Sequence, residues 1–193
     1  MIDKINSKAY VLMHDNIDTD QIIPAKFLKA TDRIGFGKHL FANWRYDKNG
    51  KESYDFPITT KQQGNSILIA GNNFGCGSSR EHAAWALIDY GIKAIVSSEF
   101  ADIFKGNAYN NGILPIQLNT KQVLALLAEL NISQEIQINL EDQTISSGTI
   151  KFPFEIPALK KQLLLSGTTE TEYLINMRDE IADFEQARSI INL

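Results

Sequence analysis

Between residues 66 and 97 the chain reads SILIAGNNFGCGSSREHAAWALIDYGIKAIVS. Two short apolar runs, at 66–71 and 94–97, are typical of buried strands, and the stretch 80–90 between them is typical of a helix. A strand, a helix and a strand in this order predict a βαβ unit, in which the two strands are parallel. The segment 71–79, rich in glycine and serine, joins the first strand to the helix.

The same alternation continues on both sides of this unit. Toward the C-terminus we expect a helix over 101–109, a strand over 113–118 and a helix over 121–130, with Thr120 as the N-cap of the last helix. Toward the N-terminus the apolar run 9–13 predicts a strand that leads into a polar loop. The chain is therefore expected to have an α/β fold, with a mixed sheet flanked by helices.

The C-terminal third has a different pattern. Residues 135–140 alternate between apolar and polar, and a turn then leads into 144–154, which predicts an antiparallel hairpin. Two further helices are expected over 157–165 and 170–190.

A single domain over residues 1–193 is the expected organisation for a chain of this length, of which 44% is hydrophobic. We expect two additions to it. One is an irregular excursion at about 35–64, where aromatic residues mix with turn formers, and the other is a C-terminal helical extension at about 168–193.

Charge and composition exclude several classes of function. The net charge of −4 comes without a long run of one sign, so nothing predicts binding to nucleic acid or to a membrane surface. No window approaches the roughly 18 apolar residues of a membrane span, and we expect a cytoplasmic protein. The single cysteine, Cys76, allows no internal disulfide and too few thiolates for an iron-sulfur cluster. His14, His39 and His82 lack metal-ligand spacing, so no metal site is expected in this chain.

The segment 71–82, GNNFGCGSSREH, carries most of the chemistry. In an open α/β sheet, ligands bind where the carboxyl end of a strand faces the N-terminus of the next helix, because free N–H groups and the helix dipole favour anions. Glycines let the backbone approach a ligand, Ser78 and Ser79 provide hydroxyls, and Arg80 provides a planar fork that suits a carboxylate. These residues predict a site for a small acid.

Two other interpretations use the same residues. Ser78 and Glu81 have the S-x-x-E spacing of a capping box, in which case the glycines only make a tight turn. Alternatively, the Gly-x-Gly at 75–77 begins a dinucleotide fingerprint, with Glu99 as its acidic residue. That fingerprint needs a third glycine for close packing, and Arg80 stands there instead.

Two segments resemble one known family. Residues 73–83, NFGCGSSREHA, resemble the signature of the aconitase C-terminal swivel domain, in the version found in small subunits of isopropylmalate dehydratases. Residues 15–24, DNIDTDQIIP, resemble the N-terminal signature of the same subunits. Ala84 departs from the pattern, since many relatives have proline there. The two motifs stand in the family's order, and the similarity in length extends across nearly the whole chain.

The resemblance implies an aconitase-like swivelling domain with β/β/α layers, and one half of a two-chain hydro-lyase. Such enzymes interconvert 2-isopropylmalate and 3-isopropylmalate by dehydration and rehydration in leucine biosynthesis. A [4Fe-4S] cluster on a large partner subunit acts on the substrate, a small dicarboxylic hydroxy acid, whereas this chain carries no cofactor. Homoaconitate, citraconate or a related malate stays open as the substrate. A stand-alone module that binds a small acid or a nucleotide is an alternative of a different class.

The two motifs also imply roles for single residues. By its position, Ser78 matches the serine that removes the substrate proton, while Ser79 and Arg80, with Gly77, match residues that bind the substrate. Asp20 matches an aspartate that orients a histidine in the other half of the site.

Residues 24–29, PAKFLK, resemble the family's loop that meets the substrate side group. The resemblance implies that Leu28 packs against an isopropyl group, with Lys29 nearby. The same pattern also suits an apolar anchor between solvated lysines.

Overall fold

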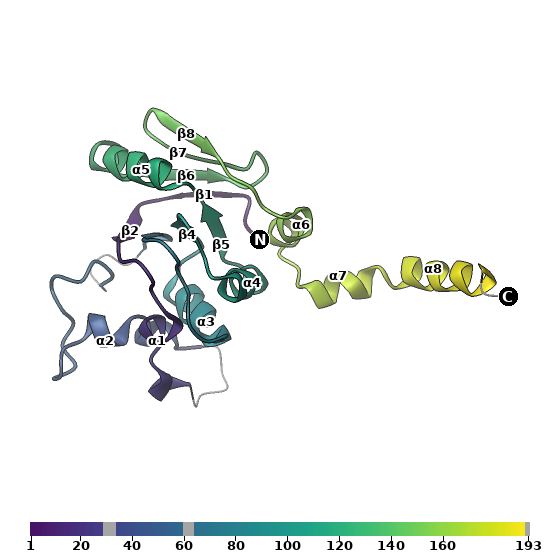
Figure 1. Cartoon of the computed structure of the whole chain (residues 1–193), viewed down its shortest axis with the longest axis horizontal. Helices are drawn as coiled ribbons and strands as arrows, with labels where there is room; N and C mark the ends of the chain where they lie inside the picture. Colours follow the sequence, from purple (N-terminus) through teal and green to yellow (C-terminus); the bar gives the residue numbers. More distant parts are fainter. Residues whose placement is uncertain (29–33, 60–63, 192–193) are drawn as a thin grey trace.

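The computed structural model describes residues 1–28, 34–59 and 64–191. Its strands form two four-stranded sheets, one parallel and one antiparallel (Figure 1). The strand order is β2-β3-β4-β5 in the parallel sheet and β1-β6-β7-β8 in the antiparallel sheet. The strands are β1 (Lys4–Ser7), β2 (Ala9–Leu12), β3 (Ile67–Ala70), β4 (Ala94–Ser97), β5 (Leu114–Gln117), β6 (Ile136–Asn139), β7 (Thr144–Ser147) and β8 (Ile150–Pro153).

Helices connect the parallel strands and extend the chain beyond the sheets (Figure 1). α3 and α4 are the crossovers between β3, β4 and β5, and α5 leads from β5 to the antiparallel sheet. None of the described helices is long and apolar enough to cross a membrane. The α-helices are α1 (Thr19–Ile22), α2 (Ala42–Arg45), α3 (Glu81–Tyr90), α4 (Asp102–Asn110), α5 (Thr120–Ser133), α6 (Ala158–Ser166), α7 (Glu170–Asn176) and α8 (Arg178–Ile191), and two 3-10 helices are η1 (Ala25–Phe27) and η2 (Gly37–His39).

The parallel sheet is covered on both faces. In β3, Leu68 and Ala70 belong to a hydrophobic cluster with α1, α3 and α4, whereas Ile67 and Ile69 belong to a second cluster with the antiparallel sheet and α5. All four residues are therefore buried, as expected of a central parallel strand. The α/β class and the β/β/α layering are confirmed, and the strands of the expected mixed sheet are divided between two sheets.

The first strand joins the two ends of the chain. β1 pairs antiparallel with β6, so that Lys4 lies opposite Asn139. The chain then enters β2, which pairs in parallel with β3, with Ala9 opposite Ile67. The first twelve residues thus belong to both sheets. β1 has no counterpart among the elements expected from the sequence.

Most other expected elements are confirmed in type and place. This holds for the expected strands 9–13, 66–71, 94–97 and 113–118, which are β2 to β5, and for the expected helices 80–90 and 101–109, which are α3 and α4.

Two local predictions in the C-terminal half are wrong. The N-cap of α5 is Asn119 and not Thr120, because Asn119 and Gln122 form a reciprocal capping box. The expected strand 144–154 is divided into β7 and β8. The turn between them contains Gly148, whose φ of +49° suits glycine.

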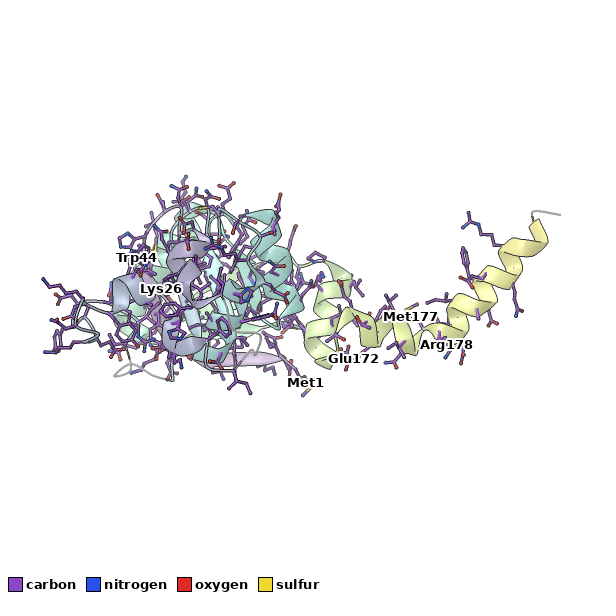
Figure 2. All side chains as sticks on the ribbon, turned by 90° about the horizontal axis from the view of Figure 1, so that it is seen from below. Met1, Lys26, Trp44, Glu172, Met177 and Arg178 are labelled. Carbon is purple, nitrogen blue, oxygen red and sulfur yellow. The ribbon has the colours of Figure 1, made fainter. Side chains whose placement is uncertain are left out.

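The last expected helix, 170–190, is interrupted at Met177. The Met177 N–H bonds to the carbonyls of Tyr173 and Leu174, and its ψ of 10° ends the regular helix. α7 and α8 extend away from the two sheets, and Figure 2 shows Met177 and Arg178 where the path of the chain bends.

The described part of the excursion, residues 34–59, packs on the helical side of the parallel sheet. Phe36, Leu40, Phe41 and Ile58 from it are buried in the cluster that includes α3. A short helix, α2, places the charged Arg45 in the interior, where Glu52 accepts a hydrogen bond from its Nε at 2.7 Å. This ion pair satisfies the buried charge.

Candidate active site

The loops that follow three parallel strands meet at one edge of the sheet. β2, β3 and β4 are neighbours that run in the same direction, so their carboxyl ends at Leu12, Ala70 and Ser97 lie side by side. The first two strands are followed by segments 13–20 and 71–80, which contain both signature motifs. This is the edge at which open α/β sheets bind ligands.

The segments 13–20 and 71–80 are joined along their length. The Asp15 carboxylate accepts the Asn72 N–H at 2.7 Å. Three backbone hydrogen bonds continue this connection, so the two motifs form one structural unit. They run from the Asn16 N–H to the Asn72 carbonyl (2.8 Å), from the Gly75 N–H to the Ile17 carbonyl (2.7 Å) and from the Thr19 N–H to the Cys76 carbonyl (2.9 Å).

Two glycines make this close packing possible. A Cβ at Gly71 would lie 2.3 Å from the carbonyl oxygen of His14, which belongs to the neighbouring loop. A Cβ at Gly75 would lie 2.1 Å from Cγ of Phe104, and the φ of Gly75 is +79°. A side chain at Gly71 would force the two loops apart, and one at Gly75 would overlap Phe104 of α4, so both glycines are needed for the shape of the edge.

Ser78 combines a fixed backbone with an exposed side chain. Its carbonyl accepts hydrogen bonds from the Thr19 hydroxyl at 3.1 Å and from the Arg80 N–H at 2.8 Å. Gly77, Ser78 and Ser79 are all exposed. Within the described part of the chain, the Ser78 hydroxyl has no hydrogen-bond partner, so it is presented to solvent or to a ligand.

The capping-box interpretation of Ser78 is wrong. Helix α3 begins at Glu81 with Arg80 as its N-cap, and no side chain makes a cap hydrogen bond there. The Glu81 carboxylate instead accepts hydrogen bonds from Trp85 Nε1 at 3.3 Å and from Asn111 Nδ2 at 3.0 Å. The Ser78 hydroxyl is thus not used to begin the helix.

The structure brings Arg80 and Asp20 together from the two motifs. Arg80 Nη2 donates to Asp20 Oδ2 at 3.3 Å, and Nη1 lies 2.5 Å from Oδ1. The hydrogen bond from Arg80, with a smaller contribution from the Ala25 N–H, holds the pKa of Asp20 below its usual value. Both terminal nitrogens of Arg80 therefore face the Asp20 carboxylate in an ion pair. A guanidinium has five N–H donors, so this pair leaves further donors for a ligand.

Cys76 belongs to the second loop and contacts the first, but its thiol is not activated. Its thiol contacts the Asn16 carbonyl at 3.4 Å. Burial, and secondarily the charge of Asp18, raise the pKa of the Cys76 thiol. A raised pKa favours the protonated thiol, which is a poor nucleophile.

The histidines do not gather into a metal site. His39 stacks on Phe27 with ring centroids 3.8 Å apart, and His82 packs at 4.5 Å from Trp85. Within residues 1–28, 34–59 and 64–191, no three His, Cys, Asp or Glu side chains are grouped to hold a metal ion. With one thiol in the whole chain, the donor set does not fit an iron-sulfur cluster.

Leu28 follows η1 and is half-buried against the helical side of the core. Lys29 lies outside the described residues. The contact between Leu28 and the core fits an anchoring role, and its role in choosing the substrate side group stays a prediction.

Thr19 is a residue of this edge for which the sequence patterns predicted no role. It is 2% exposed, and its N–H and hydroxyl hold the carbonyls of Cys76 and Ser78. Its only signal in the sequence is its place inside the segment 15–24. The contacts it makes are 57 and 59 residues distant in the chain and cannot be inferred from local spacing.

Known proteins are similar to this chain in sequence and in fold. Residues 2–121 match the family described as Aconitase C-terminal domain. The 3-isopropylmalate dehydratase small subunit of Christiangramia forsetii is 52% identical over 179 residues, which cover 90% of this chain and 87% of that protein. The corresponding subunit of Cytophaga hutchinsonii is 46% identical and covers 98% of this chain and 96% of its own length. A crystal structure of 3-isopropylmalate dehydratase (leuD) from Methanocaldococcus jannaschii has 32% identity and a TM-score of 0.67, over 94% of this chain and 99% of that one.

Proposed function

The chain belongs to the family of 3-isopropylmalate dehydratase small subunits, and from this premise we propose how its residues serve the reaction. The enzyme is a hydro-lyase of the aconitase superfamily that interconverts 2-isopropylmalate and 3-isopropylmalate in leucine biosynthesis. Residues 77–80 remove the substrate proton and bind a carboxylate. The observation that carries this proposal is the exposed Ser78 hydroxyl, on a backbone fixed by Thr19, two residues before the Arg80 guanidinium.

Arg80 is suited to bind a substrate carboxylate. Its planar fork can make two parallel hydrogen bonds to a carboxylate, and here both terminal nitrogens face the Asp20 carboxylate. The Asp20 contact shows that the fork is placed to pair with a carboxylate, and a substrate carboxylate would use its further N–H donors. Ser79 and the backbone at Gly77 are exposed beside it and add further donors for the same ligand.

Ser78 needs help to act as a base, because a hydroxyl is normally a very weak acid. A helix N-terminus contributes at most about 2 kcal/mol, which lowers a pKa by only about one and a half units. In the isolated chain Ser78 is exposed, so water weakens even this contribution. The proton is therefore removed in a closed site, where Arg80 and the backbone N–H groups act in a dry environment.

Asp20 and Leu28 act at the border of this site. Asp20 holds the Arg80 fork through the ion pair in the isolated chain. In the assembled enzyme, Asp20 orients a histidine of the other half of the site. Leu28, together with Lys29, meets the side group of the substrate and selects the isopropyl group by apolar contact.

The remaining chemistry belongs to a large partner subunit. The name of the related small subunits implies such a partner. A [4Fe-4S] cluster would supply Lewis-acid chemistry for the substrate hydroxyl, and we place it on the partner because the donor set of this chain does not fit it. We also propose that the assembled enzyme works in the cytoplasm.

Reconstitution tests this function. The purified chain is mixed under anaerobic conditions with the 3-isopropylmalate dehydratase large subunit of the same organism, and isomerisation of isopropylmalate is followed. Turnover is expected only when both chains are present, and the isolated small chain should contain no iron. Binding of a nucleotide by the chain alone, with no turnover in the mixture, would support a stand-alone binding module instead. Faster turnover of homoaconitate or citraconate than of isopropylmalate would assign that compound as the substrate.

A further inference from the structure

The C-terminal arm, defined as residues 168–191, extends from the body of the protein. Its root is fixed, because the Lys160 ammonium contacts both Glu170 of the arm and the Asn110 side chain of the body. Beyond this root, both views show α7 and α8 leading away from the sheets, with Glu172, Met177 and Arg178 along the arm (Figures 1 and 2). α7 and α8 contact each other where they meet.

Large apolar side chains of the arm face solvent. Leu174 and Ile175 of α7 are 56% and 64% exposed, and Ile181 and Phe184 of α8 are 38% and 65% exposed. Ile181 and Phe184 are three residues apart and share one face of α8. An isolated helix as short as α8, with 14 residues, is marginal in water, so packing of this face on another surface would stabilise it.

The arm also carries all of the net charge of the chain. It has six acidic and two basic residues, which gives −4, and the first 167 residues are balanced. In α8 the acidic residues Asp179 and Asp183 lie on the opposite side from Ile181 and Phe184. The charged residues of the arm are Glu170, Glu172, Arg178, Asp179, Glu180, Asp183, Glu185 and Arg188.

We propose that the C-terminal arm is a docking element for the large subunit, and that it binds an apolar groove with a basic rim on that subunit. The apolar face supplies the contact area, and the net negative charge steers the arm toward basic residues. A second copy of this chain is disfavoured, because two arms of charge −4 repel each other and the rest of the chain has no net charge to offset this. This inference rests on the proposed function, which supplies the large subunit.

A matched pair of variants tests the arm. Phe184→Asp puts a charge into the apolar face of α8, and Ala182→Asp adds the same charge on another face of the same helix. Full-length chains are titrated with the large subunit, and the concentration needed for half-maximal turnover is measured. Phe184→Asp should raise this concentration about tenfold or more, whereas Ala182→Asp should change it less than about threefold. At saturating large subunit, both variants should reach the turnover number of the unchanged protein, because neither residue belongs to the edge at 77–80.

The outcomes distinguish failure of the docking proposal from failure of the proposed function. If the unchanged chain gives no turnover with the large subunit, the proposed function fails. If it gives turnover and both variants assemble equally well, the arm is not the docking element. A dimer of the isolated chain in analytical ultracentrifugation that Phe184→Asp dissociates would identify a second copy as the occupant and overturn the proposal.

Discussion

The edge of the parallel sheet and the C-terminal arm differ in how they are packed. At the edge, segments 13–20 and 71–80 are held together by hydrogen bonds of 2.7 to 2.9 Å. In the arm, large apolar side chains face solvent. Two glycines at the edge are packed so closely that a Cβ would overlap another residue. The arm has the opposite properties, since it extends from the body and carries the net charge.

This difference separates two tasks. The edge is fixed by contacts within the chain, so the position of Ser78 relative to Arg80 is prepared before any partner binds. The arm is stabilised only weakly within the chain, so its final packing depends on another surface. Substitutions at the edge should therefore change chemistry or folding without changing assembly, and substitutions in the arm should do the reverse.

The largest effect is expected at Ser78. Ser78→Ala should lower turnover of the reconstituted enzyme by about a hundredfold or more, because positioned proton transfer contributes at least that much. The free energy of unfolding should change by less than about 1 kcal/mol, since the hydroxyl is exposed and makes no hydrogen bond within the described residues. Turnover and thermal unfolding are measured on the same preparation. A variant that is less stable but turns over normally would make Ser78 a structural residue.

The second largest effect is expected on the stability of the fold, at Gly71. Gly71→Ala places a Cβ against the His14 carbonyl and the Asp15 carboxylate, so the free energy of unfolding should fall by about 2 kcal/mol. Gly106→Ala is the matched control, because a Cβ there meets nothing within 4 Å in helix α4. The control should be neutral or stabilising by up to about 1 kcal/mol. Urea unfolding measures both, and equal losses in the two variants would contradict the close packing of the edge.

A smaller effect is expected on substrate choice. Leu28→Ala should lower kcat/KM for isopropylmalate about tenfold relative to that for a methyl-substituted malate, because apolar contact with the larger side group is lost. Arg80→Lys should instead lower kcat/KM for both substrates, since an ammonium cannot reproduce a two-pronged carboxylate contact. The ratio of the two values is compared among the reconstituted variants. An unchanged ratio in Leu28→Ala would leave Leu28 as a structural anchor only.

The smallest effect concerns the Asp20–Arg80 pair and pH. The hydrogen bond from Arg80 lowers the pKa of Asp20 in the folded chain, so the pair stabilises the fold above the unfolded pKa of about 3.9. This contribution is lost as the pH falls through the lowered folded value. It should stay below about 1 kcal/mol because Asp20 is 55% exposed. An NMR titration of the Asp20 carboxyl carbon should show its pKa rising in Arg80→Gln, and an unchanged pKa would exclude the pairing in solution.

Local sequence patterns predicted the parallel half of the fold well. The apolar runs of β3 and β4 are buried on both faces, so composition alone marks them. The predicted N-cap of α5, Thr120, was wrong, although the sequence does place Asn119 and Gln122 at the spacing of a capping box. The interruption at Met177 was not predicted, because no glycine or proline stands there. β1 was not predicted because its four residues are too few for a clear alternation.

The candidate residues came from the sequence, whereas their contacts did not. Resemblance predicted roles for Ser78, Arg80 and Asp20, and the structure places them on the segments that follow β2 and β3. Their roles stay predictions. The pairing of Arg80 with Asp20 and the support from Thr19 depend on parallel pairing of β2 with β3. Such pairing is a property of the tertiary fold, and no spacing within either motif reveals it.

The pairing of β1 with β6 has a consequence for the order in which the chain folds during synthesis. β1 is translated about 135 residues before its partner strand, because Lys4 lies opposite Asn139. At roughly 5 to 20 residues per second, the ribosome leaves the first strand without its partner for on the order of ten seconds. During that time Ile2 and Ile5, which are buried in the finished protein, stay accessible to chaperones or to other chains. Contacts of such long sequence separation also slow folding, so closure of the antiparallel sheet should be a late step.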